Sequence, residues 1–458
     1  AKSGLEINLD LVPTREDGMT GYELLLSESQ ERMLLVTKPE WLEKLKAVYE
    51  KWDLHAEVIG KVTDTERVQM TKGGELIVDL PVDMVANPPM ADRPKAAPSD
   101  LKQRWFLDRN RLLAGNLDSK FEAIMQEFAF AEAIPLTEQY DSMVGNRTLA
   151  GVGEDGAVLR LRDIPDRRVS LVLSTDCNPT VCWLFPREGG KRAVAEAALN
   201  VALKGAEPIG ITDCLNFGSP ENPEVMWQFE ECIGGISEAC RELGISVVSG
   251  NVSFYNDTDS KPIYPTPMIG MVGLSENISP APSHFTSTQE EFALLGVLEA
   301  GLGGSVLASQ WFKRDCGQPE ETDMKAVQRM LRMVRNLYGR KMKFSLHDIT
   351  EGGLAATLME MAFKSPHDCI GVEMQIPFGV DVDNFLFGET VPRVVIAYDP
   401  VERTDLEMFT SQQGVKMTIL GQTNDSGELT MIQGRSTVLK KEMKTLKARW
   451  QNRWKELF

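Results

Sequence analysis

The sequence contains one pattern twice, and this internal repeat limits the fold more than any other feature. The two copies of its clearest block read LLLSESQERMLLV and FLFGETVPRVVIA, at residues 24–36 and 385–397. Glu28 aligns with Glu389 and Arg32 with Arg393, so both pairs lie 361 residues apart. A constant spacing between matched blocks indicates a duplicated structural unit.

Two further blocks support the duplication. The stretch VIGKVTD resembles ILGQTND at the same spacing of 361, at residues 58–64 and 419–425. Residues 1–13 resemble residues 363–377 with a slip of two residues. The second copy follows a Gly-Gly turn and an apolar-periodic helix, SLHDITEGGLAATLMEMAFKS, and the first copy starts at the end of the equivalent helix. We therefore expect this chain to be the C-terminal part of a larger pseudo-repeat.

Composition restricts the class of protein. The chain has 458 residues, of which 42% are hydrophobic and 25% are charged, as in ordinary globular proteins. Its net charge of −18 argues against general binding to nucleic acid or membrane surfaces. No apolar run is long enough to cross a bilayer. The seven Cys form no CxxC motif and are expected to be reduced thiols of a cytoplasmic protein.

Residue patterns predict an α/β (α+β) fold in four parts. Residues 1–85 form a truncated first unit, and residues 86–136 are a linker followed by helices. Strands and helices alternate over 137–277, which predicts a sheet covered by helices. Residues 278–458 form a second α/β unit that contains the second copy of the repeat.

Polar residues follow three predicted strands in the 137–277 part. They are Asp176 and Asn178, Asp213 and Asn216, and Gly250, Asn251, Ser253 and Asn256. Ligands of α/β proteins often bind at the ends of strands. Carboxylate and amide oxygens suit Mg²⁺, and glycine lets the backbone approach a phosphate. An isolated Asp after a strand is, however, more often a turn residue or a helix cap.

Other candidates leave alternatives open. The Gly-Gly pair in EGGKRAVAEAALN is interpreted as a turn that opens a helix and can cradle an anion. His347 is as suited to bracing the following Gly-Gly turn as to chemistry. Ser27 to Arg32 form either a solvated loop or a site for a polar ligand. No Walker or GxGxxG motif is present, so the residues alone predict an α/β protein able to bind a magnesium phosphate ligand.

Several longer motifs resemble one family. They are ELLLSESQERML, STDCNP, EGGKRAVAEAALNV, ITDCLNFGSPENPE, SGNVSFYN and YPTPMIGMVGL. They resemble the small-type synthetase subunit of the phosphoribosylformylglycinamidine synthase family, in the aminoimidazole ribonucleotide synthetase-like superfamily. The resemblance implies an internally duplicated protein with an A and a B domain in each half. This chain would hold most of the first B domain (1–85), the second A domain (137–277) and the second B domain (278–458).

The resemblance also implies a reaction and its participants. The family uses ATP and Mg²⁺ to convert formylglycinamide ribonucleotide to formylglycinamidine ribonucleotide in purine biosynthesis. Ammonia comes from a separate glutaminase subunit, and a small bridging subunit completes the complex. The family's catalytic His lies in the first A domain, so no catalytic residue is assigned in this sequence and the chain alone is expected to be inactive.

Residue roles carried over from the family form a single substrate site. Glu28, Ser29, Gln30 and Ser253 would contact the ribonucleotide, Asp213 and Gly250 would contact ATP, and Asn251 would bind magnesium. The second copy reads Glu389, Thr390 and Val391, so its Ser and Gln are lost. Two alternatives remain: another ATP-binding enzyme of the superfamily, such as a selenophosphate synthetase, or a non-catalytic nucleotide-binding remnant.

Overall fold

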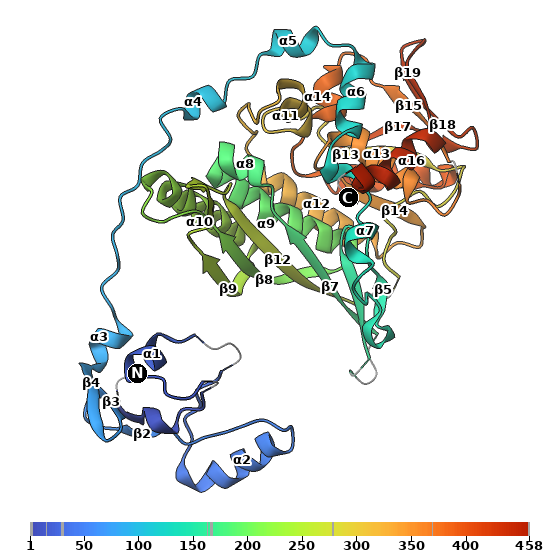
Figure 1. Ribbon diagram of the computed structural model, residues 1–458. Coiled ribbons are helices and arrows are strands. Elements are labelled where there is room, and N and C mark those ends of the chain that lie inside the picture. The colour runs from blue at the N-terminus through green and yellow to red at the C-terminus, as the bar shows by residue number, and fades with distance from the viewer. Residues whose placement is uncertain are drawn as a thin grey trace. The chain divides into compact units, whose positions relative to one another are not determined.

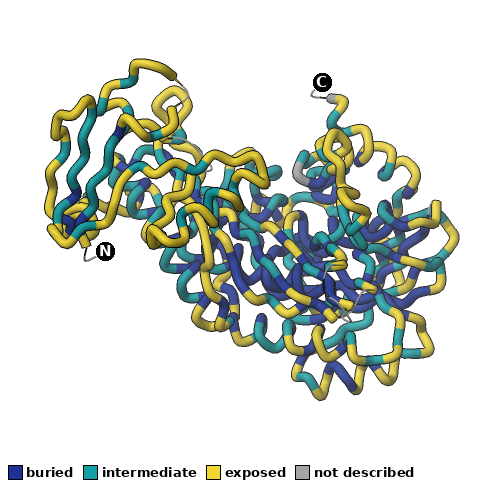
Figure 2. Tube along the Cα trace, turned by 90° about the horizontal axis from the view of Figure 1, so that it is seen from below, coloured by how far each residue is buried: buried dark blue, intermediate teal, exposed yellow. Residues whose placement is uncertain are grey.

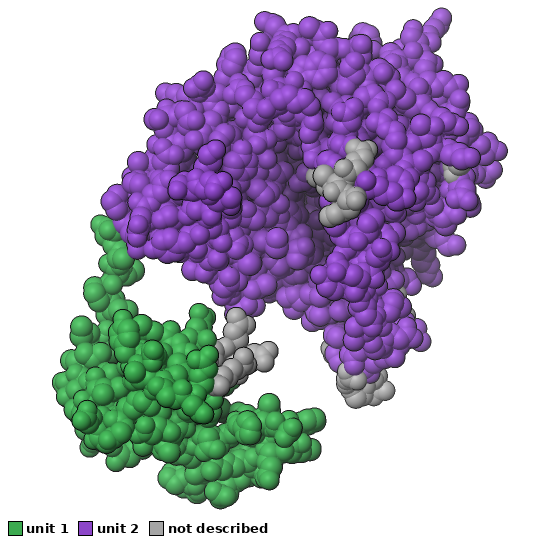
Figure 3. Space-filling view, viewed as in Figure 1, with its two compact units in different colours: residues 1–92 green, residues 93–458 purple. Residues whose placement is uncertain are grey.

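The computed structural model divides into two compact units, residues 1–92 (unit 1) and residues 93–458 (unit 2) (Figures 1 and 3). The structure describes residues 3–14, 16–28, 32–162, 164, 168–276, 279–368 and 370–456. Within these residues, no helix is both long enough and apolar enough to cross a membrane.

Unit 1 is a four-stranded sheet with short helices. Its strands have the order β2-β1-β3-β4, with β1 parallel to β3 and the other pairs antiparallel. They are β1 (Gly4–Asn8), β2 (Gly60–Thr63), β3 (Arg67–Lys72) and β4 (Glu75–Pro81). The helices are η1 (Leu9–Leu11), α1 (Gly21–Leu26), η2 (Pro39–Trp41), α2 (Leu42–Glu50) and α3 (Val82–Ala86).

Unit 2 begins with short helices that lead to a six-stranded sheet. The helices are α4 (Leu101–Arg104), α5 (Arg109–Leu113), α6 (Leu117–Met125), η3 (Phe128–Phe130), α7 (Ile134–Thr137) and η4 (Val144–Asn146). The sheet has the order β5-β6-β7-β12-β8-β9. Its strands are β5 (Thr148–Ala150), β6 (Ala157–Leu161), β7 (Val169–Asp176), β8 (Glu207–Asn216), β9 (Ser246–Ser253) and β12 (Thr266–Ser275). A small hairpin joins β10 (Asp257–Thr258) to β11 (Lys261–Pro262).

Three helices accompany this sheet. They are α8 (Pro179–Leu184), α9 (Pro186–Leu203) and α10 (Pro223–Leu243). The Ala-rich α9 contacts β7, β8 and β12 and packs along α10. It ends just before Gly205, whose φ of 81° favours glycine, as predicted from the sequence. Many side chains on the other face of the sheet are exposed.

A seven-stranded sheet completes unit 2, with the order β14-β16-β13-β17-β15-β18-β19. Its strands are β13 (Glu291–Gly296), β14 (Phe344–Asp348), β15 (Gly371–Ile376), β16 (Arg393–Tyr398), β17 (Met417–Asn424), β18 (Glu428–Gln433) and β19 (Ser436–Glu442). The helices of this part are α11 (Val306–Phe312), α12 (Met324–Leu337), α13 (Gly353–Phe363), α14 (Val382–Phe387), η5 (Pro400–Glu402), α15 (Arg403–Gln412), α16 (Met443–Asn452) and η6 (Arg453–Glu456).

Two hydrophobic cores cover the two faces of this second sheet. One core joins Val394 and Ile396 of β16 to α9 and α12, and so connects the two sheets. The other joins Val395 and Ala397 of β16 to α6, α13 and α16. Figure 2 shows that buried residues concentrate in unit 2, whereas the tube of unit 1 is mostly intermediate or exposed.

The repeat predicted from the sequence is confirmed by strand order and register. The order β2-β1-β3-β4 of unit 1 reappears in unit 2 as β17-β15-β18-β19, with the same parallel and antiparallel pairs. The β3–β4 pair has a register shift after Met70, and the β18–β19 pair has one after Met431, again 361 residues later. A matching irregularity is strong evidence for duplication, because bulges are specific features of a strand pair.

The predicted slip of two residues in the first block is wrong. Leu5 pairs with Val68, and Val372 pairs with Leu429, so β1 and β15 are related by 367 residues while β3 and β18 are related by 361. The first copy therefore has six additional residues between its first strand and its first helix. The turn η1 lies in this longer connection.

Candidate functional site

The polar residues predicted at strand ends share one level of the six-stranded sheet. Ile269 of β12 pairs with Asp176 on one side and with Asp213 on the other, and Asp213 pairs with Gly250. Asp176 is the last residue of β7, but Asp213 and Gly250 lie inside their strands, which continue for three more residues. The structure therefore brings Asp176, Asp213 and Gly250 to one level of the sheet, although two of the three predicted strand ends were placed early.

Asp213 lies directly over Gly250. A Cβ atom added to Gly250 would stand 2.1 Å from Oδ1 of Asp213, so any other residue here would displace the carboxylate. Burial raises the pKa of Asp213. Glycine at this position therefore keeps a carboxylate close to the backbone of the edge strand β9.

Asn251 and Ser253 project from the opposite, open face of the sheet. Side chains alternate along a strand, and the hydroxyls of Thr212 and Ser249 meet at 2.7 Å on the face that Asn251 shares. Ser253 ends β9, and its Oγ lies 3.2 Å from Nδ2 of Asn256. The structure therefore separates the predicted residues into a pair on the helix face (Asp213 and Gly250) and a pair on the open face of one edge strand.

The first copy of the repeat presents Glu28 to solvent. Helix α1 leads to it and begins with a capping box, in which Thr20 accepts from the N–H of Glu23 and the Glu23 carboxylate accepts from Thr20. The predicted ligands Ser29 and Gln30 lie outside the described residues.

The second copy buries the equivalent glutamate. Oε1 of Glu389 accepts hydrogen bonds of 2.8 Å from the backbone N–H groups of Val306 and Gly352. Burial and the charge of Glu351 raise the pKa of Glu389 to about 8, against the opposing effect of these N–H groups. The carboxyl group is therefore mostly protonated at neutral pH.

Beside Glu389 lies an acidic cluster that the sequence reasoning missed in part. Asp176 faces Glu196 of α9, and burial raises the pKa of both, that of Glu196 to about 8. Asn178, predicted as a ligand, instead caps α8 and donates to Glu351 at 3.0 Å. No local sequence pattern indicates that Glu196 and Glu351 belong to this cluster, because they come from a helix and a turn that are far apart in the sequence.

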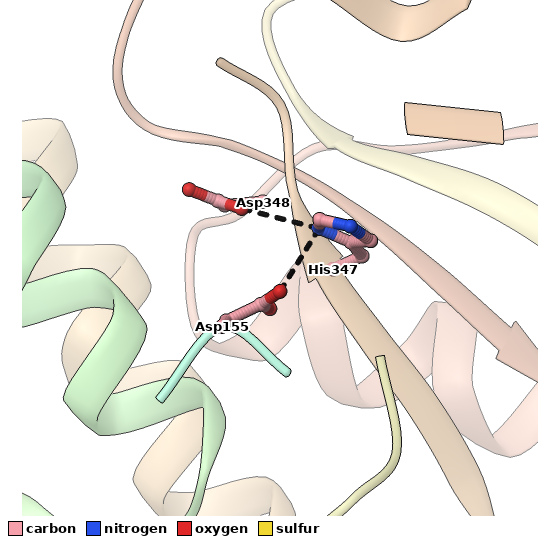
Figure 4. A group of neighbouring side chains, drawn as sticks. All are labelled: Asp155, His347 and Asp348. Carbon is pink, nitrogen blue, oxygen red and sulfur yellow. Dashed lines mark hydrogen bonds and ion pairs between the residues drawn. The ribbon is translucent and has the colours of Figure 1, made fainter. Parts of the chain in front are cut away.

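His347 is the centre of a buried charged network (Figure 4). Its Nδ1 lies 3.1 Å from Oδ1 of both Asp155 and Asp348, and its Nε2 lies 3.0 Å from Oε2 of Glu360. Burial lowers the pKa of His347, but the charge of Asp155 and the two other carboxylates outweigh it and raise the pKa to about 10. The imidazolium provides the positive charge that these carboxylates need.

A small cavity adjoins this network. It is lined by residues of α6, the start of α11, the turn after β14 and α13, including His347, Glu351 and Glu360. Val306 and Gly352, whose N–H groups bind Glu389, also line this cavity.

The predicted anion cradle at Gly189 and Gly190 is wrong. Both glycines lie inside α9 and are buried. A Cβ on Gly189 would stand 2.5 Å from Sγ of Cys182, and one on Gly190 would stand 2.3 Å from the carbonyl oxygen of Cys232. The glycines allow α9 to approach α8 and α10 closely, which is a packing role.

Two family models match most of the chain. The AIR synthase related protein N-terminal domain matches residues 153–275, and the corresponding C-terminal domain matches residues 1–73 and again 289–433. The chain belongs to the AIR synthase related proteins. The double match to one domain agrees with the duplication seen in the strand order.

Sequence relatives of this AIR synthase related chain include PurL subunits. The "Phosphoribosylformylglycinamidine synthase subunit PurL" of Carboxydothermus hydrogenoformans is 37% identical over 98% of this chain and 61% of the relative. The same subunit of Nitratiruptor sp. is 38% identical over 92% of this chain and 57% of the relative. The chain thus spans about three fifths of the curated relatives it matches.

Solved structures show the same fold. T. maritima PurL complexed with ADP has a TM-score of 0.62 and 24% identity, and covers 92% of this chain and 60% of that one. T. maritima PurL complexed with FGAR has a TM-score of 0.60 and 23% identity, and covers 92% of this chain and 58% of that one.

Proposed function

We propose that this chain is the nucleotide-binding and substrate-binding part of a phosphoribosylformylglycinamidine synthase. The overall reaction converts formylglycinamide ribonucleotide, ATP and glutamine-derived ammonia to formylglycinamidine ribonucleotide, ADP and phosphate. The observation that carries the proposal is the identity of 37% to a PurL subunit over 98% of the chain. The ATP and FGAR complexes of T. maritima PurL supply the matching ligands.

The chemistry explains why a nucleotide site is needed. An amide carbon is a poor electrophile, so the amide oxygen must first accept a phosphoryl group from ATP, which leaves as ADP. Ammonia then attacks that carbon and phosphate departs, with the lost protons passing to solvent. Positioning and charge neutralisation are the main contributions that a protein makes to such a transfer.

The residues of β8 and β9 have distinct roles in this proposal. Asp213 and the backbone at Gly250 bind ATP, and Ser253 contacts the ribonucleotide. Asn251 would hold Mg²⁺, since its face of the sheet offers amide and hydroxyl oxygens, and Mg²⁺ accepts oxygen ligands and retains several waters. When bound, the ion would offset negative charge on the phosphates.

The first copy of the repeat supplies the rest of the substrate site in this proposal, through Glu28, Ser29 and Gln30. The second copy replaces Gln30 by Val391, which is buried. In a complete enzyme that also contains the first A domain, Gln30→Val should therefore lower kcat/KM by about tenfold to a hundredfold, the expected loss of about 1.5–3 kcal/mol for a hydrogen bond to a charged ligand. The reciprocal Val391→Gln should leave kcat/KM nearly unchanged. Equal losses from both substitutions would contradict a single site.

The proposal extends to domains, partners and location. We assign residues 1–85 to a first B domain, 137–277 to an A domain and 278–458 to a second B domain, with 86–136 as linker and helices. The partners would be a glutaminase subunit and a small bridging subunit in the cytoplasm, with neither nucleic acid nor membrane involved. The net charge of −18 and the PurL relatives support these assignments.

Isothermal titration of the full chain with MgATP tests the nucleotide site. Micromolar to millimolar binding is expected for the chain, and Asp213→Asn and Asn251→Ala should each weaken it by tenfold or more. Glu407→Gln, on the exposed side of α15, is the control and should bind as tightly as the parent. Unchanged affinity in both site variants would refute the assigned roles.

A further inference from the structure

The turn after β9 folds one side chain back onto the strand that it leaves. Nδ2 of Asn256 lies 2.9 Å from the carbonyl oxygen of Ser253, 3.2 Å from its Oγ and 3.0 Å from the carbonyl oxygen of Phe217. The Asn256 amide therefore joins the end of β9 to the residue that follows β8. Asn256 is one of the polar residues that follow predicted strands, and the proposed function gives it no role.

The distances around the amide indicate how the Ser253 hydroxyl is oriented. Two carbonyl oxygens face Nδ2, and since carbonyls only accept, they determine which end of the Asn256 amide points to the strand. Oδ1 of Asn256 lies 3.4 Å from the hydroxyl, beyond the usual range of about 2.5–3.0 Å for such a bond. Among the described residues, no other acceptor lies within reach of the hydroxyl. Its hydrogen is therefore available to an oxygen atom of a ligand.

A group of aromatic side chains holds this junction in place. Phe217 is 1% exposed and meets Phe229 edge to face at 5.2 Å, and Phe254 packs against Phe229 at 5.1 Å, both measured between ring centroids. The N–H of Phe217 donates to the carbonyl of Ser253 at 3.0 Å, and the N–H of Asn256 donates to the carbonyl of Phe217 at 3.2 Å. The Asn256 amide is thus supported by the hydrophobic core of unit 2.

Tyr255, directly before Asn256, has an unfavourable backbone conformation. Its φ of 61° lies in the left-handed region, which residues other than glycine rarely adopt. The N–H of Tyr255 donates to the carbonyl of Gly218 at 3.1 Å and so fixes the turn on the segment after β8. Such conformations are retained where the surrounding structure enforces them, and they are concentrated at functional sites.

We propose that Asn256 is a positioning residue for Ser253. Its Nδ2 holds both the carbonyl and the hydroxyl oxygen of Ser253, which leaves the hydroxyl hydrogen to be donated to an oxygen atom of the ribonucleotide. Asn256 acts through Ser253 and does not itself contact the ligand. The inference rests on the proposed contact between Ser253 and formylglycinamide ribonucleotide. It does not involve the proposed MgATP site, which lies further inside β8 and β9.

Titration calorimetry of the full chain with formylglycinamide ribonucleotide tests this role. Asn256→Ala and Ser253→Ala should each weaken binding by about fivefold, the usual effect of losing one hydrogen bond. The double variant should bind no more weakly than Ser253→Ala alone, because a residue that acts through Ser253 then has nothing left to position. Asn256→Asp keeps the size of the side chain but replaces the donor by an acceptor, so it should lose at least as much affinity as Asn256→Ala.

Titration with MgATP separates positioning from a general loss of structure. Both Asn256 variants should bind MgATP within about twofold of the parent, since the ladder between β8 and β9 holds that site without them. Asn452→Ala is the matched control, because the exposed Asn452 amide also donates to a backbone carbonyl, that of Ala448 at 2.6 Å. It should leave the affinity for both ligands unchanged.

The possible results distinguish this inference from the proposed function. Unchanged ribonucleotide affinity in Asn256→Ala, beside a loss in Ser253→Ala, would overturn the positioning role and leave the proposed function standing. The inference would also fail if the double variant lost the product of both factors, if Asn256→Asp bound like the parent, or if MgATP affinity fell in parallel. A parent chain that binds no ribonucleotide, or a Ser253→Ala variant that binds it as tightly as the parent, would refute the proposed substrate contact and the positioning role together.

Discussion

Replacing Glu196 by Gln should stabilise the chain, and the gain should depend on pH. Glu196 is buried on α9, and burial together with the charge of Glu351 raises its pKa from 4.5 to about 8. At pH 7 the carboxyl group is therefore protonated in the folded chain and ionised in the unfolded chain. The chain must therefore bind a proton at this residue when it folds, which costs free energy at pH 7. A Gln side chain folds without this cost.

The magnitude follows from proton linkage. Each pKa unit corresponds to about 1.4 kcal/mol, so a shift from 4.5 to about 8 destabilises the folded state by about 3 kcal/mol at pH 7 and by about 1 kcal/mol at pH 5. Because the folded-state pKa of an acid is raised, the loss of stability grows as pH rises from 4.5 to 8. The Gln amide can also donate to the Asp176 carboxylate, which faces residue 196.

Urea denaturation of the full chain at pH 5, 6, 7 and 8, followed by circular dichroism, measures this gain. Glu196→Gln should raise the free energy of unfolding by up to about 3 kcal/mol at pH 7 and by about 1 kcal/mol at pH 5. The exposed control Glu407→Gln should change it by less than about 0.5 kcal/mol at each pH. A gain that is equal at pH 5 and pH 7, or a loss at pH 7, would refute the reasoning.

Three further substitutions test other parts of unit 2. Arg393→Met should destabilise the chain by at least about 2 kcal/mol in urea denaturation, since the buried carbonyls of Phe385 and Gly388 lose their donor at about 1–3 kcal/mol each. The part-buried carbonyls of Val297 and Leu298 add less. A smaller change would mean that water replaces the guanidinium. Gly250→Ala should weaken MgATP binding about tenfold or more by displacing the Asp213 carboxylate, and unchanged titration calorimetry would disprove that contact. His347→Gln should cost about 3–5 kcal/mol near neutral pH by leaving carboxylates unpaired. Because the pKa of His347 is raised from 6.5 to about 10, its contribution is full below pH 6.5 and lost as pH rises through 10, so thermal melts of parent and variant should converge there.

The duplicated architecture was predictable because the same short sequence patterns occur in both copies at one constant spacing. Blocks around Glu28 and Glu389 keep one spacing, and strand register preserves that spacing down to the bulges after Met70 and Met431. The slip in the first block was misjudged because β1 has few distinguishing residues, and only its pairing with β3 locates it. Loop length is weakly constrained by energy, so insertions there leave little trace in sequence.

The buried charged networks could not be predicted in the same way. His347 meets Asp155 from a loop after β5 and Glu360 from α13, and these residues are brought together only by the packing of two sheets. The Gly-Gly pair at residues 189 and 190 was misinterpreted for a related reason. A glycine that permits close helix packing and one that opens a phosphate loop look identical in sequence, and the neighbouring Cys182 backbone distinguishes them.

One glutamate in two copies shows how far environment determines chemistry. Glu389 is 3% exposed, accepts two backbone N–H groups and has a pKa of about 8, so it is mostly neutral at pH 7. Glu28 occupies the equivalent position in unit 1 but faces solvent. The two N–H groups that bind Glu389 come from Val306, which follows β13, and from Gly352, which follows β14. The repeat therefore predicts where each glutamate lies in its unit, whereas the elements packed around it determine how far its carboxyl group is buried.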